Sequence, residues 1–435
     1  MITLEDKKIS RRKFLTACAG AVVVASGGLA LANKNIWRSL TGQAEVMSAD
    51  EIADVKFDRQ IITKDNTVAR TIMWQTDEPM EKPLVEYRQQ GRAIESMAPS
   101  ADTFMDDGAS VIIYTASLTE LPAGKTLEYR ITAGENKGPW HSLRLDDGND
   151  FSALIFPDSQ SNDYSDWQNL VQGAYKRNAN ASFFINMGDL VDNGEDHKQW
   201  QDWLAAVGGI IDRIPVAPIM GNHETYNQKW KVREPVAYLH EFSVPDNGSA
   251  DFSKYYYSFD YGAVHFIVLN TQEDEVAEFK PDSHLLSEQQ AWFRQDVQHS
   301  DKKWKVVLMH RDPLQYRIHN RPERMEGIDE IGKIWMPLFD ELRIDVVFSA
   351  HLHTYRNRGH LKNFVPDAQG PLYILTGVAG NVRYPNLWID HALDKKIAPQ
   401  PETDNYIVFS ATSEKLNISC YLPDGTEIDH EIVSR

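Results

Sequence analysis

Cysteine is nearly absent from this chain of 435 residues, which contains only Cys18 and Cys420. Cys18 lies in an N-terminal stretch that we expect to be removed, so one cysteine remains in the mature chain. A single cysteine excludes an intrachain disulfide and a metal cluster built on thiolates. Basic residues are also scarce, because 45 Lys and Arg stand against 63 Asp and Glu and the formal net charge is −18. We therefore expect no duplex nucleic acid partner held by phosphate neutralisation.

Long hydrophobic runs are missing too, apart from one moderately apolar stretch over residues 16–31. The sequence SRRKFL at residues 10–15 precedes it and ALA at residues 30–32 ends it, which predicts a twin-arginine signal peptide over residues 1–32. An uncleaved transmembrane anchor is the alternative, since the stretch is nearly long enough to span a bilayer. The signal predicts that the twin-arginine export machinery carries the folded protein to the bacterial periplasm or beyond it.

Two domains are expected after a linker over residues 33–53, since the chain is longer than one ordinary domain. Within residues 54–146, large side chains alternate with smaller ones in short runs separated by turn residues, over 67–75, 84–88, 111–115 and 127–131. This pattern predicts an antiparallel β-sandwich of immunoglobulin or fibronectin type. The region contains no cluster of catalytic residue types, so we expect it to serve packing or to flank the substrate.

A polar break, DDGND at residues 146–150, predicts the boundary to a second domain over residues 150–435. Beyond it, apolar strands alternate with helical patterns over residues 167–177, 197–206, 287–298 and 331–342. This alternation is typical of a layered α/β architecture. We also expect a hairpin that turns at Tyr261-Gly262, and three C-terminal strands that add an antiparallel edge to the sheet, over residues 406–411, 416–421 and 427–432.

Five short apolar runs of this second domain lead into residues that bind metals or phosphate. The runs are typical of strands buried on both faces, and they lead to Asp158, Asp189, Asn222, His310 and His351, with His353 two residues further on. Because ligand crevices in α/β sheets lie beyond the carboxyl ends of the strands, we expect these side chains to meet at one edge.

The set supplies mixed oxygen and nitrogen donors that suit two hard or borderline divalent ions. Asp189 has two carboxylate oxygens and is expected to bridge both ions. A pair of ions roughly 3.5–4 Å apart clamps a phosphoryl group and generates a nucleophile near neutral pH. The residues alone therefore predict phosphate ester chemistry.

At this point the sequence resembles the calcineurin-like metallophosphoesterase superfamily, whose blocks occur here in order as DSQ at 158–160, GD at 188–189, GNHE at 221–224, MH at 309–310 and AHLH at 350–353. More narrowly it is similar to the purple acid phosphatase branch, which places a fibronectin-type sandwich before the catalytic domain. The resemblance covers roughly residues 54–435. It implies an α/β fold class, an αββα sandwich built on two sheets, behind the N-terminal all-β domain.

The resemblance also implies a role for each matching residue. It assigns Asp158, Asp189 and His353 to a first ion, and Asp189, Asn222, His310 and His351 to a second. Gln160 stands where many relatives have a ligand histidine, so we include it as a weaker ligand. The ions are expected to be two divalent or mixed-valence metals from among Fe, Zn, Mn and Mg.

Two further histidines are candidate catalytic residues. His223 matches the histidine that binds the phosphoryl oxygen or protonates the leaving group in relatives, with a hydrogen-bonded loop histidine as the alternative. His319 lies where acid phosphatase relatives carry substrate-contacting histidines, with a solvated loop residue as the alternative. Arg311 is expected to pair with a neighbouring acid rather than with substrate phosphate.

One departure from the family pattern bears on the identity of the metals. Purple acid phosphatases carry a tyrosine three residues after the bridging aspartate, where this chain has Asp192. We therefore expect no tyrosinate-to-iron colour, and we interpret Asp192 as a turn residue rather than a replacement ligand.

The sequence favours an exported two-metal phosphoesterase that hydrolyses a small phosphate monoester by attack of a metal-bound hydroxide. The first alternative is a phosphodiesterase or nucleotidase acting on extracellular nucleotides or glycerophosphodiesters, which an aromatic platform from Tyr226, Trp230 or Tyr355 would favour. The second alternative is a binding or surface-interaction protein with a degenerate metal centre, which Gln160 keeps open.

Overall fold

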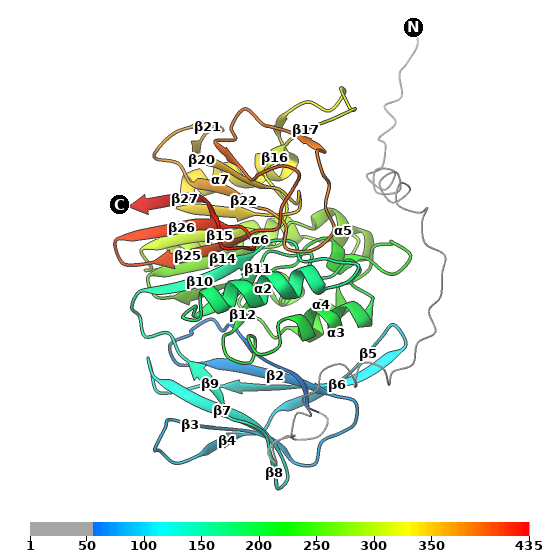
Figure 1. Cartoon of the computed structure of the whole chain (residues 1–435), viewed down its shortest axis with the longest axis vertical. Coiled ribbons are helices and arrows are strands. Elements are labelled where there is room, and N and C mark those ends of the chain that lie inside the picture. The colour runs from blue at the N-terminus through cyan, green and yellow to red at the C-terminus, as the bar shows by residue number, and fades with distance from the viewer. Residues whose placement is uncertain (1–54, 435) are drawn as a thin grey trace. The chain divides into compact units, whose positions relative to one another are not determined.

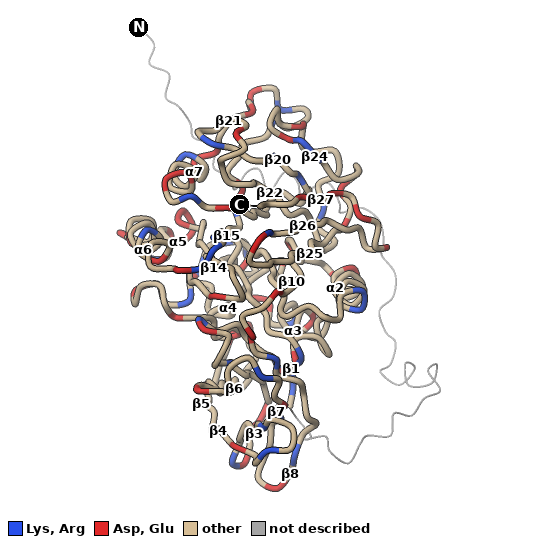
Figure 2. Tube along the Cα trace, turned by 90° about the vertical axis from the view of Figure 1, so that its left-hand side faces the viewer, with Lys and Arg blue, Asp and Glu red and all other residues tan. Residues whose placement is uncertain are grey.

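The computed structural model describes residues 55–434. The predicted signal peptide and the whole of the predicted linker lie outside the described residues. Within residues 55–434, no helix is long and apolar enough to cross a membrane. Basic and acidic residues are interspersed along the described part of the trace (Figure 2).

The largest sheet has ten strands in the order β27-β26-β25-β10-β11-β12-β1-β2-β6-β5 (Figure 1). Its central strands run parallel to one another and are β10 (Phe151–Phe156), β11 (Phe183–Asn186) and β12 (Val216–Pro218). The C-terminal strands extend it as an antiparallel edge, as predicted: β25 (Tyr406–Ala411), β26 (Lys415–Tyr421) and β27 (Glu427–Ser434).

A second sheet has the order β13-β14-β15-β19-β22-β20-β21, with β24 paired to β20. Its parallel core consists of β14 (Val264–Leu269), β15 (Trp304–Met309), β19 (Val346–Ser349) and β22 (Leu372–Thr376). The antiparallel strands are β13 (Tyr257–Tyr261), β20 (Tyr355–Lys362), β21 (Val365–Pro366) and β24 (Lys396–Ile397). The pairing of β13 with β14 confirms the hairpin predicted at Tyr261-Gly262.

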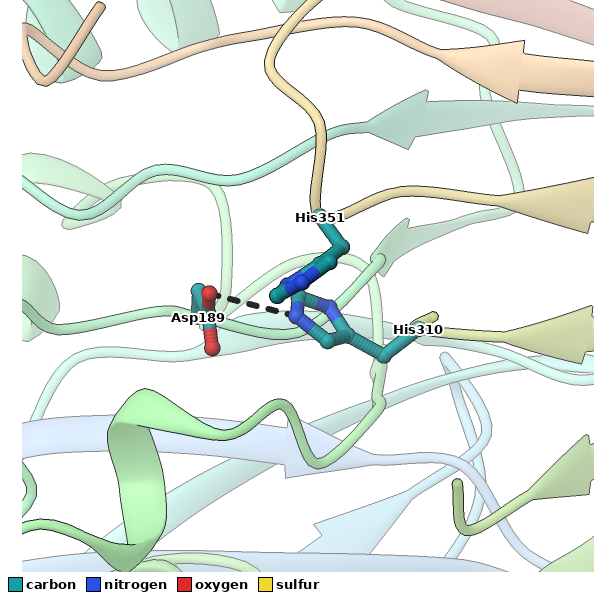
Figure 3. A group of neighbouring side chains, drawn as sticks. All are labelled: Asp189, His310 and His351. Carbon is teal, nitrogen blue, oxygen red and sulfur yellow. Dashed lines mark ion pairs between the residues drawn. The ribbon is translucent and has the colours of Figure 1, made fainter. Parts of the chain in front are cut away.

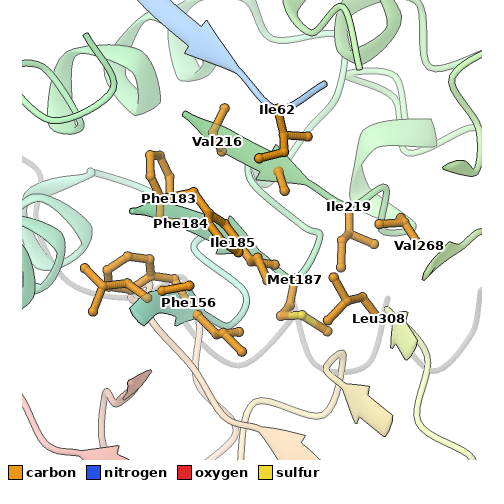
Figure 4. Packing of buried hydrophobic residues seen from close by; sticks show 14 of the residues in the cluster. Ile62, Phe156, Phe183, Phe184, Ile185, Met187, Val216, Ile219, Val268 and Leu308 are labelled. Atoms are coloured by element: carbon orange, nitrogen blue, oxygen red, sulfur yellow. The ribbon is translucent and has the colours of Figure 1, made fainter. Parts of the chain in front are cut away.

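The alternation of side chains along β15 explains why the two sheets stack. Val306 and Leu308 join the cluster that also contains the first sheet's Phe183, which packs edge-on against Phe266 of the second sheet, whereas Val307 and Met309 pack with Trp335 of a helix. Figure 4 shows buried side chains of both sheets, among them Phe183 and Leu308. Since neighbouring residues of a strand point to opposite faces, one face of this sheet meets the other sheet and the other face meets helices.

Helices complete the αββα layers that the sequence predicted. On the first sheet, Trp167 stacks on Trp203, so α2 (Ser165–Arg177) and α3 (His197–Ala206) pack together. The second sheet is covered by α6 (Leu285–His299) and α7 (Glu330–Leu342), whose Phe293 and Trp335 are in contact. Shorter elements are α4 (Val236–Glu241), α5 (Glu273–Phe279), η2 (His223–Thr225), η3 (Ala250–Phe252), β16 (Leu314–Gln315), β17 (Arg317–Ile318), β18 (Gly327–Ile328) and β23 (Trp388–Ile389).

The N-terminal strands enclose a core of their own between two sheets. One side comprises β1 (Lys56–Ile61), β2 (Arg70–Thr76), β5 (Ser100–Asp106) and β6 (Ala109–Leu118). The other comprises β3 (Pro83–Arg88), β4 (Glu95–Met97), β7 (Thr126–Ala133), β8 (Asn136–Lys137) and β9 (His141–Arg144). Trp74 and Tyr129, from opposite sheets, belong to the same buried cluster.

These N-terminal strands are joined to the first sheet by a single parallel register, Ile61 opposite Val216. Buried polar contacts reinforce the junction, since the Arg59 guanidinium binds Glu241 at 2.8 Å and the Tyr129 hydroxyl donates to the carbonyl of Asp212 at 2.9 Å. The predicted domain limits, 54–146 and 150–435, stay predictions.

Candidate metal centre and active site

The six strongest predicted ligands lie just beyond strands that end at one edge of the two stacked sheets. Asp158 follows β10, Asp189 follows β11 and Asn222 follows β12 in the first sheet. In the second sheet, His310 follows β15, and His351 and His353 follow β19. All but His351 are buried. Figure 3 shows Asp189, His310 and His351 converging from different strands.

Asp189 belongs to two groups of potential metal ligands. One group is Asp189, His310 and His351, the other is Asp158, Asp189 and His353, and the ligand atoms of each group lie within 4.8 Å of one another. The Asn222 carboxamide oxygen lies 3.3 Å from His310 Nε2 and so borders the first of these groups. A carboxylate shared between two sets of donors suits a pair of bridged ions.

Backbone carbonyls turn two of the imidazoles toward the carboxylates. His310 Nδ1 donates to the carbonyl of Met187 at 2.9 Å, so His310 Nε2 faces Asp189 Oδ2 at 3.2 Å. In the same way, His353 Nδ1 bonds the carbonyl of Val382, and His353 Nε2 lies 3.0 Å from Asp158 Oδ2. Metal-binding histidines are commonly oriented by such a hydrogen bond at the other ring nitrogen.

His351 presents a different arrangement that also fits a metal ion. Its Nδ1 is buried and has no hydrogen-bond partner among residues 55–434. Burial, together with the positive charges of His310 and Arg311, lowers its pKa well below the ordinary value. A neutral imidazole with an unused buried nitrogen is the form that binds a cation.

Opposite charges compensate one another at the shared carboxylate. Burial alone would raise the pKa of Asp189, but the positive charges of His310 and His223 outweigh it and hold that pKa well below its usual range. Burial opposes protonation of His310, whereas Asp189 and Asp158 raise its pKa to about 9. The carboxylates thus stabilise a positive charge at this point, and a bound cation would displace the proton of His310.

Three of the ligands have an unusual backbone conformation. The φ angles of Asp189, His351 and His353 are 49°, 76° and 52°, in the left-handed region that side chains rarely adopt. Gly188 and Gly221 permit the close approach of their loops, because a Cβ at Gly188 would lie 2.5 Å from His310 Nδ1 and one at Gly221 would lie 2.1 Å from Asp189 Oδ1. Strained backbone of this kind gathers at functional sites.

Glu224 holds two of the ligand loops together, a role that the sequence did not predict. Its carboxylate accepts hydrogen bonds from the backbone N–H groups of Asp189 at 3.0 Å, Leu190 at 2.8 Å and Gly221 at 2.7 Å. Both oxygens accept, which suits an ionised carboxylate, although burial and the charge of Asp189 raise the pKa of Glu224. The only signal in the sequence was its position directly after Asn222 and His223.

His223 lies beside the shared carboxylate with a defined orientation. Its Nδ1 donates to the carbonyl of Asp192 at 2.7 Å, and its Nε2 lies 3.9 Å from Asp189 Oδ2. Burial would lower its pKa, but the negative charges of Asp189 and Asp192 raise it. The rings of Tyr226 and Trp230 stand perpendicular to the imidazole at centroid distances of 5.6 and 5.7 Å.

The remaining predicted residues have varied positions. Gln160 is buried and its amide atoms have no hydrogen-bond partner among the described residues, while its backbone N–H donates to the carbonyl of Asp189 at 2.9 Å. His319 lies exposed after β17, and its catalytic role stays a prediction. Arg311 pairs with Glu275, as expected. Tyr355 donates its hydroxyl to Asp429.

Comparison with known proteins agrees with this geometry. Residues 141–355 match the model of the calcineurin-like phosphoesterase family. Purple acid phosphatase 23 of Arabidopsis thaliana is 29% identical over 187 residues, which cover 42% of this chain and 38% of that protein. Purple acid phosphatase 1 of Ipomoea batatas is 26% identical over 299 residues, 62% of this chain and 59% of that protein. The chain spans less than half the length of several Arabidopsis relatives that it matches.

Solved structures share the fold. The purple acid phosphatase PPD1 from yellow lupin seeds superimposes with a TM-score of 0.70 at 16% identity, covering 88% of this chain and 74% of that one. PhoD gives a TM-score of 0.61 at 12% identity, covering 88% and 90%. The fold and the ligand groups define a metallophosphoesterase-like protein. More specifically, residues 141–355 resemble a calcineurin-like phosphoesterase domain, and the chain is similar to the purple acid phosphatases.

Proposed function

We propose that the protein is a metal-dependent phosphoesterase that hydrolyses small phosphate monoesters. The observation that carries the proposal is the position of Asp189, which belongs to both groups of ligand atoms while His223 Nε2 lies 3.9 Å from its Oδ2. Relatives that are named purple acid phosphatases support the same activity.

The ligand residues would hold two ions, which when bound supply Lewis acidity and an activated water at neutral pH. Asp158 and His353 would hold one ion. The other would be held by His310, His351 and Asn222, and Asp189 would contribute to both. The chain's own contribution is to fix these donors: the Met187 and Val382 carbonyls orient two imidazoles, and Glu224 ties the Asp189 loop to the Gly221 loop. Preorganised donors need no rearrangement when charge develops.

His223 would act as the proton donor to the leaving oxygen. Its Nδ1 proton is engaged by the Asp192 carbonyl, so the proton that can be transferred is on Nε2, the nitrogen facing the ligand groups. At a pH below the ordinary imidazole pKa of about 6.5, Nε2 would carry this proton. General acid catalysis of this kind contributes about 10²–10⁴-fold to a rate.

The experiment measures metal content and hydrolysis of paired aryl phosphate mono- and diesters by the mature protein, before and after adding Mn, Zn or Fe. We expect two ions per chain, metal-dependent turnover, and a preference for the monoester. Asn222→Ala should lose both metal and turnover, whereas His223→Asn should keep the metal and lose about 10²–10⁴-fold in kcat. Absence of both metal and turnover in the wild type would instead support the binding-protein alternative.

A phosphodiesterase or nucleotidase activity is the second candidate. The observation that favours it is the pair of aromatic rings, Tyr226 and Trp230, beside His223. A preference for the diester in the same experiment would select it.

We also propose export through the twin-arginine route, supported by the sequence SRRKFL at residues 10–15. Replacing both arginines by lysine should retain the protein in the cytoplasm, which fractionation of the cells would measure. Unchanged export of that variant would contradict the proposal.

A further inference from the structure

Trp230 is a large aromatic residue kept at the surface beside the site. Its relative exposure is 47%, although large apolar side chains usually gain from burial. Its φ angle is 55°, in the left-handed region that a bulky side chain rarely adopts. An exposed ring in a strained backbone needs a reason other than the stability of the fold.

The loop around Trp230 is built to keep that conformation. The Asn227 side-chain oxygen accepts the N–H groups of Lys229 and Lys231, each at 2.9 Å, and Trp230 N–H donates to the carbonyl of Asn227 at 2.7 Å. The same carbonyl accepts the Asn193 amide at 2.7 Å. Since Asn193 lies four residues after Asp189, these bonds connect the loop to the metal-ligand loop.

The Trp230 ring lies close to the proposed proton donor. Trp230 is 5.7 Å from the His223 ring and 6.0 Å from the Tyr226 ring, measured between centroids. The interplanar angle to His223 is 88°, so the imidazole does not stack on the indole. A planar group bonded to the oxygen that His223 protonates would therefore reach the exposed part of the Trp230 ring.

We infer that Trp230, backed by Tyr226, is the specificity-determining platform of this site and selects phosphate esters whose leaving group carries an aromatic ring. This inference rests on the proposed function of His223 and the ligand groups. Contact between aromatic rings contributes about 0.5–1.5 kcal/mol beyond area burial, which corresponds to a preference of about 2- to 12-fold.

The test uses two matched pairs of compounds. 2-Phenylethyl and 2-cyclohexylethyl phosphate have leaving groups of similar size and basicity, and the two corresponding phosphonates cannot be hydrolysed. For the metal-loaded wild type we expect kcat/KM and the phosphonate Kd each to favour the phenyl member about 2- to 12-fold. Trp230→Ala should reduce both ratios to about one, and Trp230→Phe should retain part of each.

Partial misfolding or metal loss in the variant does not mimic this result. A misfolded or metal-poor protein acts on and binds the phenyl and cyclohexyl compounds less well to the same degree, so the ratio between them is unchanged. A wild type without phenyl preference, or a Trp230→Ala ratio equal to that of the wild type, would overturn the inference even if turnover is normal. A wild type that hydrolyses neither ester but binds the phenyl phosphonate preferentially through Trp230 would overturn the proposed function and support the platform.

Discussion

Arg233 and Asp106 form a two-bond ion pair between parts of the chain that are 127 residues apart. Arg233 Nη1 lies 3.0 Å from Asp106 Oδ1, and Nη2 lies 2.6 Å from Oδ2. Asp106 ends β5 in the N-terminal strands, whereas the Arg233 backbone donates to the carbonyl of Thr225, next to the loop that carries Tyr226 and Trp230. The N-terminal strands thus hold a loop of the active site.

The first prediction concerns this ion pair. Asp106→Ala should destabilise the protein by about 1–3 kcal/mol, since it leaves a mostly buried guanidinium with Glu195 as its remaining charged partner. It should also accelerate amide hydrogen exchange over residues 225–233 and reduce the preference for phenyl over cyclohexyl esters, because the loop loses its attachment.

Glu86→Ala provides the matched control, since Glu86 forms a similar two-bond pair with Arg130 at 2.8 and 2.6 Å within the N-terminal strands. It should lower stability comparably and leave exchange over residues 225–233 unchanged. Equal effects of both substitutions on that loop would mean that the Asp106 pair has no special role there.

A second prediction concerns the close approach of the Gly221 and Asp189 loops. In Gly221→Ala, the added Cβ would lie 2.1 Å from Asp189 Oδ1 and 2.5 Å from the Asp189 backbone nitrogen, so the shared ligand must move. We expect metal affinity to fall by about 10- to 100-fold, as it does when residues that support a ligand are lost.

Metal titration followed by thermal unfolding measures this fall, as a smaller rise of the midpoint at a given Mn concentration. Gly327→Ala is the control, because its Cβ would meet nothing within 4 Å. If Gly221→Ala binds the metal as tightly as the wild type, the Asp189 loop moves to accommodate the added Cβ without loss of metal affinity.

The sequence was sufficient to predict those features that follow from local pattern. Apolar runs predicted β10, β11, β15 and β19, and the abrupt change to a polar residue predicted where the ligands lie. The parallel pairing of β10 with β11 then brings Asp158 and Asp189 to one edge of the first sheet, and that of β15 with β19 does the same for His310 and His351 in the second sheet. This is a consequence of sheet topology and needs no knowledge of side-chain contacts.

Features that depend on distant contacts were not predictable in this way. The single register between Ile61 and Val216 joins the N-terminal strands to the first sheet, yet neither segment differs from an ordinary strand in sequence. The role of Glu224 could not be recognised from its place after Gly221, Asn222 and His223, because its three backbone donors come from loops that only the fold brings together. The left-handed backbone of His351 and His353 likewise has no signature in residue type.

Glu224 gives the third prediction. Glu224→Gln replaces one accepting oxygen by an NH₂ group, which must then face a backbone N–H of Leu190, Asp189 or Gly221. Because hydrogen bonds to a charged acceptor contribute about 1.5–3 kcal/mol and an unsatisfied buried donor adds to the loss, we expect destabilisation by about 3 kcal/mol.

Urea unfolding of the metal-free protein measures the loss, and Glu278→Gln on the exposed side of α5 should have no comparable effect. Near-wild-type stability of Glu224→Gln would indicate that Glu224 is protonated in the folded protein, since glutamine resembles the neutral acid.

The fourth prediction is a pH dependence of stability at the junction between β9 and the segment before β12. His141 Nδ1 lies 2.9 Å from Asp212 Oδ2, and its Nε2 lies 3.4 Å from Asp58 Oδ2. Burial and the charge of Arg213 lower the pKa of His141, but the hydrogen bond to Asp212 and the charges of Asp58 and Asp212 outweigh them and raise it. The folded protein therefore binds this proton more tightly than the unfolded chain.

A histidine with a raised pKa stabilises the fold fully below its ordinary value of about 6.5, and this contribution is lost as the pH rises through the folded value. His141→Gln should therefore destabilise the protein more at pH 6 than at pH 9, by about 1.4 kcal/mol for every tenfold difference in proton affinity between the folded and unfolded chains.

Urea unfolding measures this difference. A chelator is present because His141, Asp58 and Asp212 have ligand atoms within 4.8 Å of one another, which a cation would also fit. His299→Gln, at an exposed position of α6, provides the control for loss of an imidazole elsewhere on the surface. If the destabilisation caused by His141→Gln is equal at both pH values, the imidazole is not held as a cation between the two aspartates, and the junction is stabilised by its neutral hydrogen bonds alone.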